Sequence, residues 1–137
     1  SEMCIRDRDE AETYFGGFDK SKVSPISCPD NVTFDSFGNL WVSTDGNALE
    51  SNDGLFAVAL EGETRGLTKQ FLTVPAGAET CGPLVFDKRV IVNVQHPGED
   101  EEATVKTSTS HWPDGGDSIA RPATVVAWKD DFGTIGA

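Results

Sequence analysis

A strand–turn–strand pattern that occurs twice constrains the fold of this chain more than any other feature of its sequence. The first copy comprises Val32–Phe34, a turn at 36–39 and Leu40–Ser43, and the second comprises Leu84–Phe86, a turn at 88–89 and Val90–Val94. The dipeptide Phe34-Asp35 recurs as Phe86-Asp87, an offset of 52 residues. Because one four-stranded blade of a β-propeller occupies about 40 to 50 residues, the repeat predicts two successive blades.

Turn residues and alternating apolar residues predict one blade over 32–74 and most of a second over 84–128. In the first blade, a hairpin at 32–43 is followed by the predicted third and fourth strands at 55–60 and 68–74. The second blade resumes at 124–128 after a polar stretch over about 99–121, which predicts a long surface excursion. Strand-forming residues dominate throughout, so the predicted fold class is all-β. Phe34 and Phe86 are expected at equivalent core positions.

Two blades cannot close a ring, because propellers take about four to eight blades and an isolated repeat cannot bury its own faces. The chain is therefore expected to be an incomplete part of a larger propeller, with residues 14–137 in one domain and apolar blade faces left exposed. Residues 1–13 are predicted to form a non-native or disordered leader. The first eight residues, SEMCIRDR, resemble a translated sequencing adapter, which would make Cys4 foreign to the protein.

The chain has 23 acidic and 11 basic residues, for a formal net charge of −12. This balance argues against nucleic acid and anionic membranes as partners, because both require a basic surface. No run of 18 apolar residues occurs, so no membrane span is predicted. The acidic run at 99–102 is expected to be solvated surface, whereas acidic residues next to strand starts are candidates for a site.

Polar residues precede the first strand of each predicted blade, where loops of a propeller converge near its axis. Asp30 and Asn31 hold this place in the first copy, and Glu79 and Thr80 hold it in the second. Carboxylate and amide oxygens are the ligands that a hard cation such as Ca²⁺ prefers. We therefore expect Asp30 and Glu79 to bind a metal, with Asn31 and Thr80 lining the site. The alternative is that Asp30 and Asn31 only cap a turn after Pro29.

Three further residues have more than one interpretation. Cys28 and Cys81 precede the two copies of the repeat, and each has three interpretations: a small buried apolar residue, a disulfide partner or a thiol ligand. Burial is favoured because neither cysteine belongs to a zinc-type cluster. His96 follows a strand and is either a turn histidine satisfied by backbone or a site-lining residue with a ligand or acid–base role. No nucleophile elbow, phosphate-binding loop or His-Glu-x-x-His motif occurs, so the catalytic residues stay unassigned.

Five segments in a fixed order point to a protein family. They are Ser24–Val32 (SPISCPDNV), Gly38–Val42 (GNLWV), Gly77–Pro83 (GAETCGP), Gln95–Glu99 (QHPGE) and Arg121–Val126 (RPATVV). This ordered set resembles the C-terminal end of PhoX-type alkaline phosphatases, and the resemblance spans about Tyr14 to Ala137. The segment Gly-Asn-Leu-Trp is common among propellers, whereas the whole set is specific.

The resemblance implies a mostly six-bladed propeller that hydrolyses phosphate monoesters at an iron and calcium centre on its axis. It also implies Ca²⁺ and Fe³⁺ as cofactors, a small phosphoester as substrate, and twin-arginine export to the periplasm or beyond. Asp30 matches a metal-bridging carboxylate of the family, and Asn31 and Glu79 match site-lining positions. The iron-binding thiolate, the phosphate-contacting arginine, the remaining blades and the signal sequence are expected upstream. The 137-residue chain by itself is therefore expected to be inactive.

Bound cations would reconcile an acidic site with an anionic substrate, because they overcompensate the carboxylates and hold the substrate oxygens. Two other functions stay open. One is a calcium-dependent lactonase of the gluconolactonase type, whose propellers have similar Pro-Asp and Gly-Asn-Leu-Trp-Val segments. The other is a non-catalytic propeller that serves as a binding scaffold, since a fold alone does not determine function.

Overall fold

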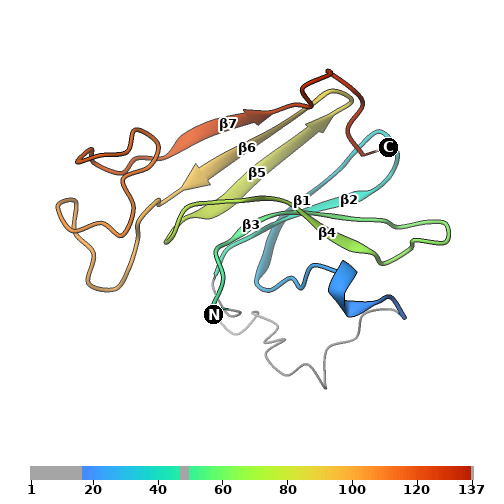
Figure 1. The fold of residues 1–137 in the computed structure, drawn as a ribbon, viewed down its shortest axis with the longest axis horizontal. Coiled ribbons are helices and arrows are strands. Elements are labelled where there is room, and N and C mark those ends of the chain that lie inside the picture. Colours follow the sequence, from blue (N-terminus) through green and yellow to red (C-terminus); the bar gives the residue numbers. More distant parts are fainter. Residues whose placement is uncertain (1–16, 47–49, 137) are drawn as a thin grey trace.

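The computed structural model of this chain describes residues 17–46 and 50–136, and it confirms the all-β prediction with two antiparallel sheets (Figure 1). The first sheet has the order β1-β2-β3-β4 and the second has the order β5-β6-β7. The strands are β1 (Pro29–Phe34), β2 (Leu40–Thr44), β3 (Gly54–Val58), β4 (Thr68–Thr73), β5 (Glu79–Phe86), β6 (Arg89–Gln95) and β7 (Ala123–Ala127). A single-turn 3₁₀ helix, η1 (Lys20–Lys22), precedes them and is capped by the Asp19 side chain. In the described residues no helix is long and apolar enough to cross a membrane.

The turn between β1 and β2 is built around the carboxylate of Asp35. Its Oδ1 accepts hydrogen bonds from the backbone N–H groups of Phe37 and Asn39, both at 2.9 Å, and its Oδ2 accepts one from the indole N–H of Trp41 at 2.9 Å. An aspartate that bonds backbone two residues ahead is typical of such turns. The same carboxylate therefore fixes the hairpin and orients the largest side chain of the core.

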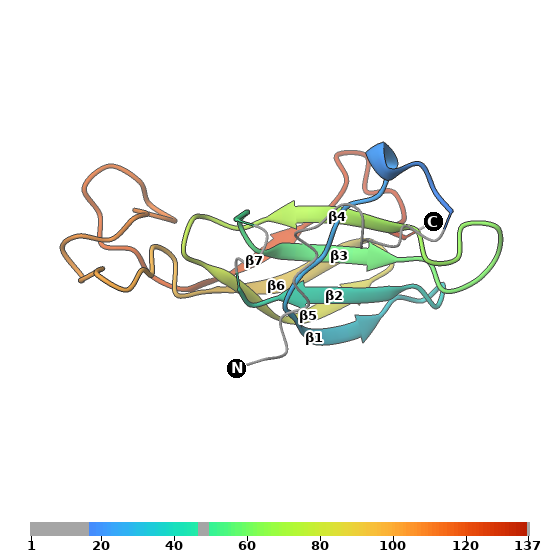
Figure 2. The same ribbon diagram turned by 90° about the horizontal axis from the view of Figure 1, so that it is seen from below.

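The two sheets pack face to face, and β5 lies against β1 and β2 (Figure 2). The main cluster between them contains Trp41 and Leu55 from the first sheet, Val90 from the second, and Ile135 from the segment that follows β7. Ile135 is held there by a hydrogen bond from its N–H to the carbonyl of Asp87 at 2.8 Å. This stacking of successive four-stranded and three-stranded meanders is the arrangement of neighbouring propeller blades.

Phe34 and Phe86 hold equivalent positions, but the expectation that they lie in the core is wrong for this chain. Each is the last residue of its strand, and their side chains are 58% and 47% exposed. Successive side chains of a strand point to opposite faces. Because Trp41, the cross-strand partner of Thr33, lies in the core, the neighbouring Phe34 points away from it. Val85 likewise packs on the core cluster and directs Phe86 to the opposite face.

The connection between β6 and β7 is long and contains no strand, as expected for the excursion. It is nevertheless held by internal hydrogen bonds. The N–H of Thr109 donates to the carbonyl of Gly98 at 3.2 Å, and Nδ1 of His111 lies 2.8 Å from the carbonyl oxygen of Ser118. Arg121 forms an ion pair with Asp114 at 3.0 Å. The excursion is therefore a structured loop that extends beyond one end of the second sheet (Figure 1).

Candidate functional site

The predicted site residues lie within strands rather than in loops ahead of them. β1 begins at Pro29, which pairs with Thr44, and β5 begins at Glu79, which pairs with Gln95. Asp30 and Asn31 are therefore part of β1, and Glu79 and Thr80 are part of β5. The sequence boundaries missed these residues because each strand is interrupted by a bulge soon after it starts.

The two bulges hold equivalent places in the two copies, so the offset of 52 residues between the copies is the same on both sides of them. The β1–β2 register shifts between Pro29 and Val32, and the β5–β6 register shifts between Cys81 and Leu84. With Phe34 aligned on Phe86, Asp30 corresponds to Gly82 and not to Glu79. The prediction that Asp30 and Glu79 occupy matching places is therefore wrong. Bulges re-aim side chains and are common next to functional sites.

Asn31 joins the two bulges directly. Its side-chain oxygen accepts a hydrogen bond from the backbone N–H of Gly82 at 3.0 Å. Gly82 has a φ of 56°, in the left-handed region that glycine adopts without strain. Asn31 thus acts as a connector between blades at the level of the site.

Glu79 is the most perturbed carboxyl group of this region. Its side chain is only 13% exposed, accepts a hydrogen bond from the amide of Gln95, and lies 3.6 Å from Nε2 of His96. Burial, the hydrogen bond with Asp45 and the charges of Asp45 and Asp30 together raise the pKa of Glu79 to about 7, against the bond from Gln95, which lowers it. The carboxyl groups of Asp30 in β1 and Asp45 after β2 therefore interact electrostatically with that of Glu79 in β5. They do so although Glu79 and Asp30 do not hold equivalent positions in the repeat.

Asp45 is a member of the site that the sequence analysis missed. It directly follows β2, and its N–H donates to the carbonyl of Cys28 at 3.0 Å, which places the end of β2 beside the start of β1. The sequence signal available was an acidic residue immediately after the strand that pairs with the Asp30 segment.

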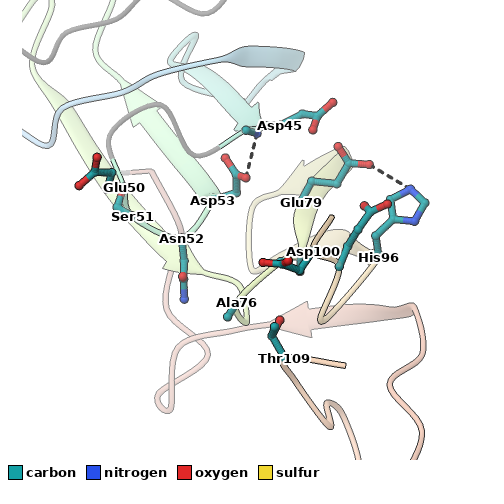
Figure 3. Close-up of a pocket in the computed structure, with 14 residues that line it drawn as sticks. Asp45, Glu50, Ser51, Asn52, Asp53, Ala76, Glu79, His96, Asp100 and Thr109 are labelled. Carbon is teal, nitrogen blue, oxygen red and sulfur yellow. Dashed lines mark hydrogen bonds and ion pairs between the residues drawn. The ribbon is translucent and has the colours of Figure 1, made fainter. Parts of the chain in front are cut away.

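Asp45, Glu79 and His96 border a pocket of about 710 Å³ (Figure 3). Figure 3 shows Glu79 beside His96, and Asp53 bonded to the backbone N–H of Gly46, the residue after Asp45. The acidic residues that line the pocket come from the connection between β2 and β3, from the start of β5 and from the excursion: Asp45, Glu50, Asp53, Glu79, Glu99 and Asp100. His96 stands at this pocket with a side chain that is 53% exposed. Asp30 is not among the lining residues of the described chain.

Backbone contacts hold the excursion against the pocket. The N–H of Gly98 donates to the carbonyl of Ala76 at 2.8 Å, and the N–H of Glu99 donates to the carbonyl of Gly77 at 3.2 Å. A Cβ on Gly77 would lie 2.1 Å from the backbone oxygen of Glu99, so only glycine permits this close approach. The Glu99 wall of the pocket therefore has a fixed position relative to β5.

Two of the polar residues around the pocket have structural roles. Thr80 is fully buried, and its hydroxyl donates to the carbonyl of Gly54 at 2.7 Å and accepts from the N–H of Thr44 at 3.2 Å. It joins the two sheets and does not line the pocket, which corrects the prediction that it lines the site. Asp53 accepts from the Thr44 hydroxyl at 2.5 Å and from the N–H of Gly46 at 2.9 Å, and burial raises its pKa.

The cysteines differ from each other. Cys28 is buried and disulfide-bonded, so its burial was predicted correctly but the favoured interpretation omitted the bond. Cys81 is free and half-buried, and burial, followed by the charges of Glu79, Asp30 and Asp45, raises the pKa of its thiol. A thiol kept protonated in this way is a poor metal ligand and nucleophile. The predictions about Cys4 and the leader over 1–13 fall outside the described residues.

The donor set of the site suits a hard cation without completing its coordination. Within residues 17–46 and 50–136, no three His, Cys, Asp or Glu side chains are arranged to hold a metal ion. The carboxylates of Glu79, Asp45 and Asp30 are nevertheless oxygen donors of the kind that Ca²⁺ binds, and Ca²⁺ takes about six to eight of them. This part of the chain can therefore contribute some of the ligands, and the others would have to come from elsewhere.

Comparisons with known proteins give a consistent result. The chain matches the family model of alkaline phosphatase PhoX over residues 3–98, a range that begins within the predicted leader and includes Asp30, Glu79 and His96. Among solved structures it is similar to Pseudomonas fluorescens PhoX in complex with vanadate, a transition state analogue, with 25% identity and a TM-score of 0.66. That match covers 85% of this chain and 21% of the PhoX chain. No curated protein matches the chain.

Proposed function

This chain belongs to the alkaline phosphatase PhoX family, and from that premise we propose that it supplies one wall of the metal site of an enzyme that hydrolyses phosphate monoesters. The supporting observation is the group of interacting carboxyls formed by Glu79, Asp45 and Asp30 beside an acidic pocket. A phosphate dianion would be repelled by these groups unless cations compensated them. The family match favours a phosphatase over the lactonase and the binding scaffold.

We assign Asp30 and Glu79 as carboxylate ligands of an iron and calcium centre, and we add Asp45 to them. The centre would neutralise the carboxylates, hold the substrate oxygens and stabilise charge on the leaving oxygen. Gln95 and His96 contact Glu79 and would orient its carboxylate. Asn31 and Thr80 would keep β1 and β5 in register, so that the acidic residues at the starts of these strands stay close together.

The remainder of the protein is also part of the proposal. The chain spans 21% of the PhoX structure that it resembles, and we place it in a six-bladed propeller whose other blades supply the missing metal ligands and the catalytic residues. Such an enzyme would be exported by the twin-arginine route and would act in the periplasm or outside the cell. The 137-residue chain would then be inactive by itself.

The test uses a longer PhoX protein that includes this chain. Glu79→Gln and Asp30→Asn should each lower calcium and iron content and phosphomonoester turnover together, by at least about tenfold, because each removes a charged ligand while keeping the side chain's shape. Glu102→Gln is the matched control, since Glu102 is exposed in the excursion. Unchanged metal content in both ligand variants would refute the assignment. Turnover of lactones in place of phosphomonoesters would refute the phosphatase.

A further inference from the structure

The excursion between β6 and β7 consists of two loops, each of which is closed by hydrogen bonds between its ends. In the first loop, the N–H of Thr109 and the hydroxyl of Ser108 both donate to the carbonyl of Gly98, each at 3.2 Å. In the second loop, the N–H of Arg121 donates to the carbonyl of Trp112 at 3.1 Å. The first loop lines the pocket beside Glu79 through three of its residues, Glu99, Asp100 and Thr109.

The first loop has a fixed position relative to Glu79, because it is attached near both of its ends. At its start, the N–H of Glu99 donates to the carbonyl of Gly77, two residues before Glu79, at 3.2 Å. Just after its end, Trp112 packs on the apolar cluster that contains Ala78, the residue before Glu79. The loop and the Glu79 carboxyl are therefore held by the same short segment at the start of β5.

The structure divides the acidic run at 99–102 into two halves. All four residues are exposed, as expected for solvated surface, but Glu99 and Asp100 line the pocket and Glu101 and Glu102 do not. The side chain of Asp100 accepts a hydrogen bond from the N–H of Glu102 at 3.2 Å, which orients its carboxylate. One half of the run therefore acts on the contents of the pocket, and the other half provides controls of the same charge.

The charge of the first loop would remain when cations fill the proposed metal site. The charges that act on the Glu79 carboxyl come from Asp45 and Asp30, and cations bound by these three groups would neutralise them. Glu99 and Asp100 lie outside this group, and in the described chain no lysine or arginine lines the pocket. Charges of one sign around a pocket act on a charged ligand as it approaches. The first loop therefore presents a negative wall beside the metal site.

We propose that Glu99 and Asp100 are specificity-determining residues, which disfavour phosphomonoesters whose leaving group carries a second anionic group and favour neutral or cationic leaving groups. The inference rests on the proposed function, because the phosphate must be held by cations at Glu79 for the leaving group to extend along the first loop. It also goes beyond that function. The match to the PhoX family model ends at residue 98, directly before Glu99, so membership of the family does not account for these two carboxylates.

Three small alkyl phosphates test the inference in a longer PhoX protein that includes this chain. Their leaving groups are neutral in propyl phosphate, cationic in aminoethyl phosphate and anionic in carboxymethyl phosphate. For each ester, kcat/KM of Glu99→Gln is divided by that of the wild type, so that the intrinsic reactivity of the ester cancels. We expect this ratio to be about threefold to tenfold higher for the anionic ester than for the neutral one, and lower for the cationic ester by a similar factor. About 1 M salt should remove most of the difference, because it screens the charges.

Two further variants test how the first loop is positioned. Trp112→Ala removes the side chain that attaches the excursion to the apolar cluster, so it should weaken the discrimination against carboxymethyl phosphate in the same direction as Glu99→Gln. Trp112→Phe keeps an aromatic ring in the cluster and should retain the discrimination. A change in charge preference is not expected from a loss of stability alone, which would lower turnover of all three esters equally.

The control and the metal content separate the possible outcomes. Glu101→Gln removes a neighbouring charge that does not line the pocket, so it should leave the three ratios equal. Equal ratios in a variant that combines Glu99→Gln with Asp100→Asn would overturn the inference. Loss of calcium or iron from Glu99→Gln would also overturn it, because Glu99 would then be a metal ligand. A wild-type protein that hydrolyses none of the three esters would refute the proposed function, and the inference with it.

Discussion

The side-chain oxygen of Asn31 accepts a hydrogen bond from the backbone N–H of Gly82 at 3.0 Å, and this bond joins the bulges of β1 and β5. It links two residues that hold neighbouring positions in the two copies of the repeat. The bond matters for the site because Asp30 precedes Asn31 and Glu79 lies at the start of the strand that contains Gly82. Any change at Asn31 should therefore alter both the packing of the sheets and the position of the carboxyl groups.

Asn31→Ala should lower the free energy of unfolding of the chain by about 1 kcal/mol, since it leaves the Gly82 N–H without its partner. Asn31→Asp keeps an acceptor oxygen at the same place and should retain more of that stability than the alanine variant at high ionic strength, where salt screens the new charge from Asp30 and Glu79. Urea denaturation followed by tryptophan fluorescence measures both. Equal stability of wild type and Asn31→Ala would show that the bond contributes nothing.

Thr80 provides a second connection between the sheets, and it should be more sensitive to substitution. Thr80→Val removes the hydroxyl that bonds Gly54 and Thr44 but keeps the shape of the side chain, so it should cost about 1 to 3 kcal/mol by leaving buried backbone groups unpaired. Thr80→Ser keeps the hydroxyl and is the matched control. If Thr80→Ser is as destabilising as Thr80→Val in the same urea titration, the methyl group rather than the hydroxyl is the important part.

Asp35 should make the stability of the chain depend on pH in the acid range. Burial raises the pKa of Asp35, but the hydrogen bonds from Trp41, Asn39 and Phe37 together lower it below the ordinary value of 3.8. A carboxyl whose pKa is lower in the folded state contributes stability above the unfolded value and loses it as the pH falls through the folded value. Asp35→Asn should therefore be less stable than wild type at pH 6, and the difference should shrink below pH 3.8. A constant difference across this range would contradict the assignment.

Local chemistry explains which parts of this fold could be predicted from the sequence. The β1–β2 hairpin follows from residues 35–39, because the aspartate, glycine and asparagine of the turn interact within the turn itself. The strand pairs of both sheets follow from the alternation of apolar residues and the repeat at Phe34 and Phe86. The turn and the alternation involve residues that are close in sequence, the repeat compares two such local patterns, and the structure confirms the strands that they predict.

The parts that could not be predicted depend on contacts between distant segments. The strands β1 and β5 begin before their bulges, so Glu79 was matched to Asp30 by its place ahead of the predicted strand, although Gly82 is the residue that lies 52 positions after Asp30. Asp45 reaches Glu79 only because β2 packs beside β5, which no local pattern reveals. Thr80 was expected in the site for the same reason that Glu79 was, yet side chains alternate along a strand, and that of Thr80 points into the packing between the sheets.

The interaction between Asp45 and Glu79 gives the most direct test of the candidate site in the metal-free chain. After burial, the hydrogen bond and the charge of Asp45 are the next causes that raise the pKa of Glu79 to about 7. Asp45→Asn should therefore bring that pKa closer to its ordinary value of 4.5, as measured by the carboxyl carbon shift in an NMR titration. The folded state of the wild type binds a proton at Glu79 more tightly than the unfolded state, so this group lowers stability as the pH rises from 4.5 to about 7. Asp45→Asn should reduce that loss.

Asp114→Asn, in the excursion, is the matched control and should leave the Glu79 titration unchanged. An unaltered pKa of Glu79 in Asp45→Asn would mean that the two carboxyls do not share a site, and it would remove Asp45 from the proposed ligands.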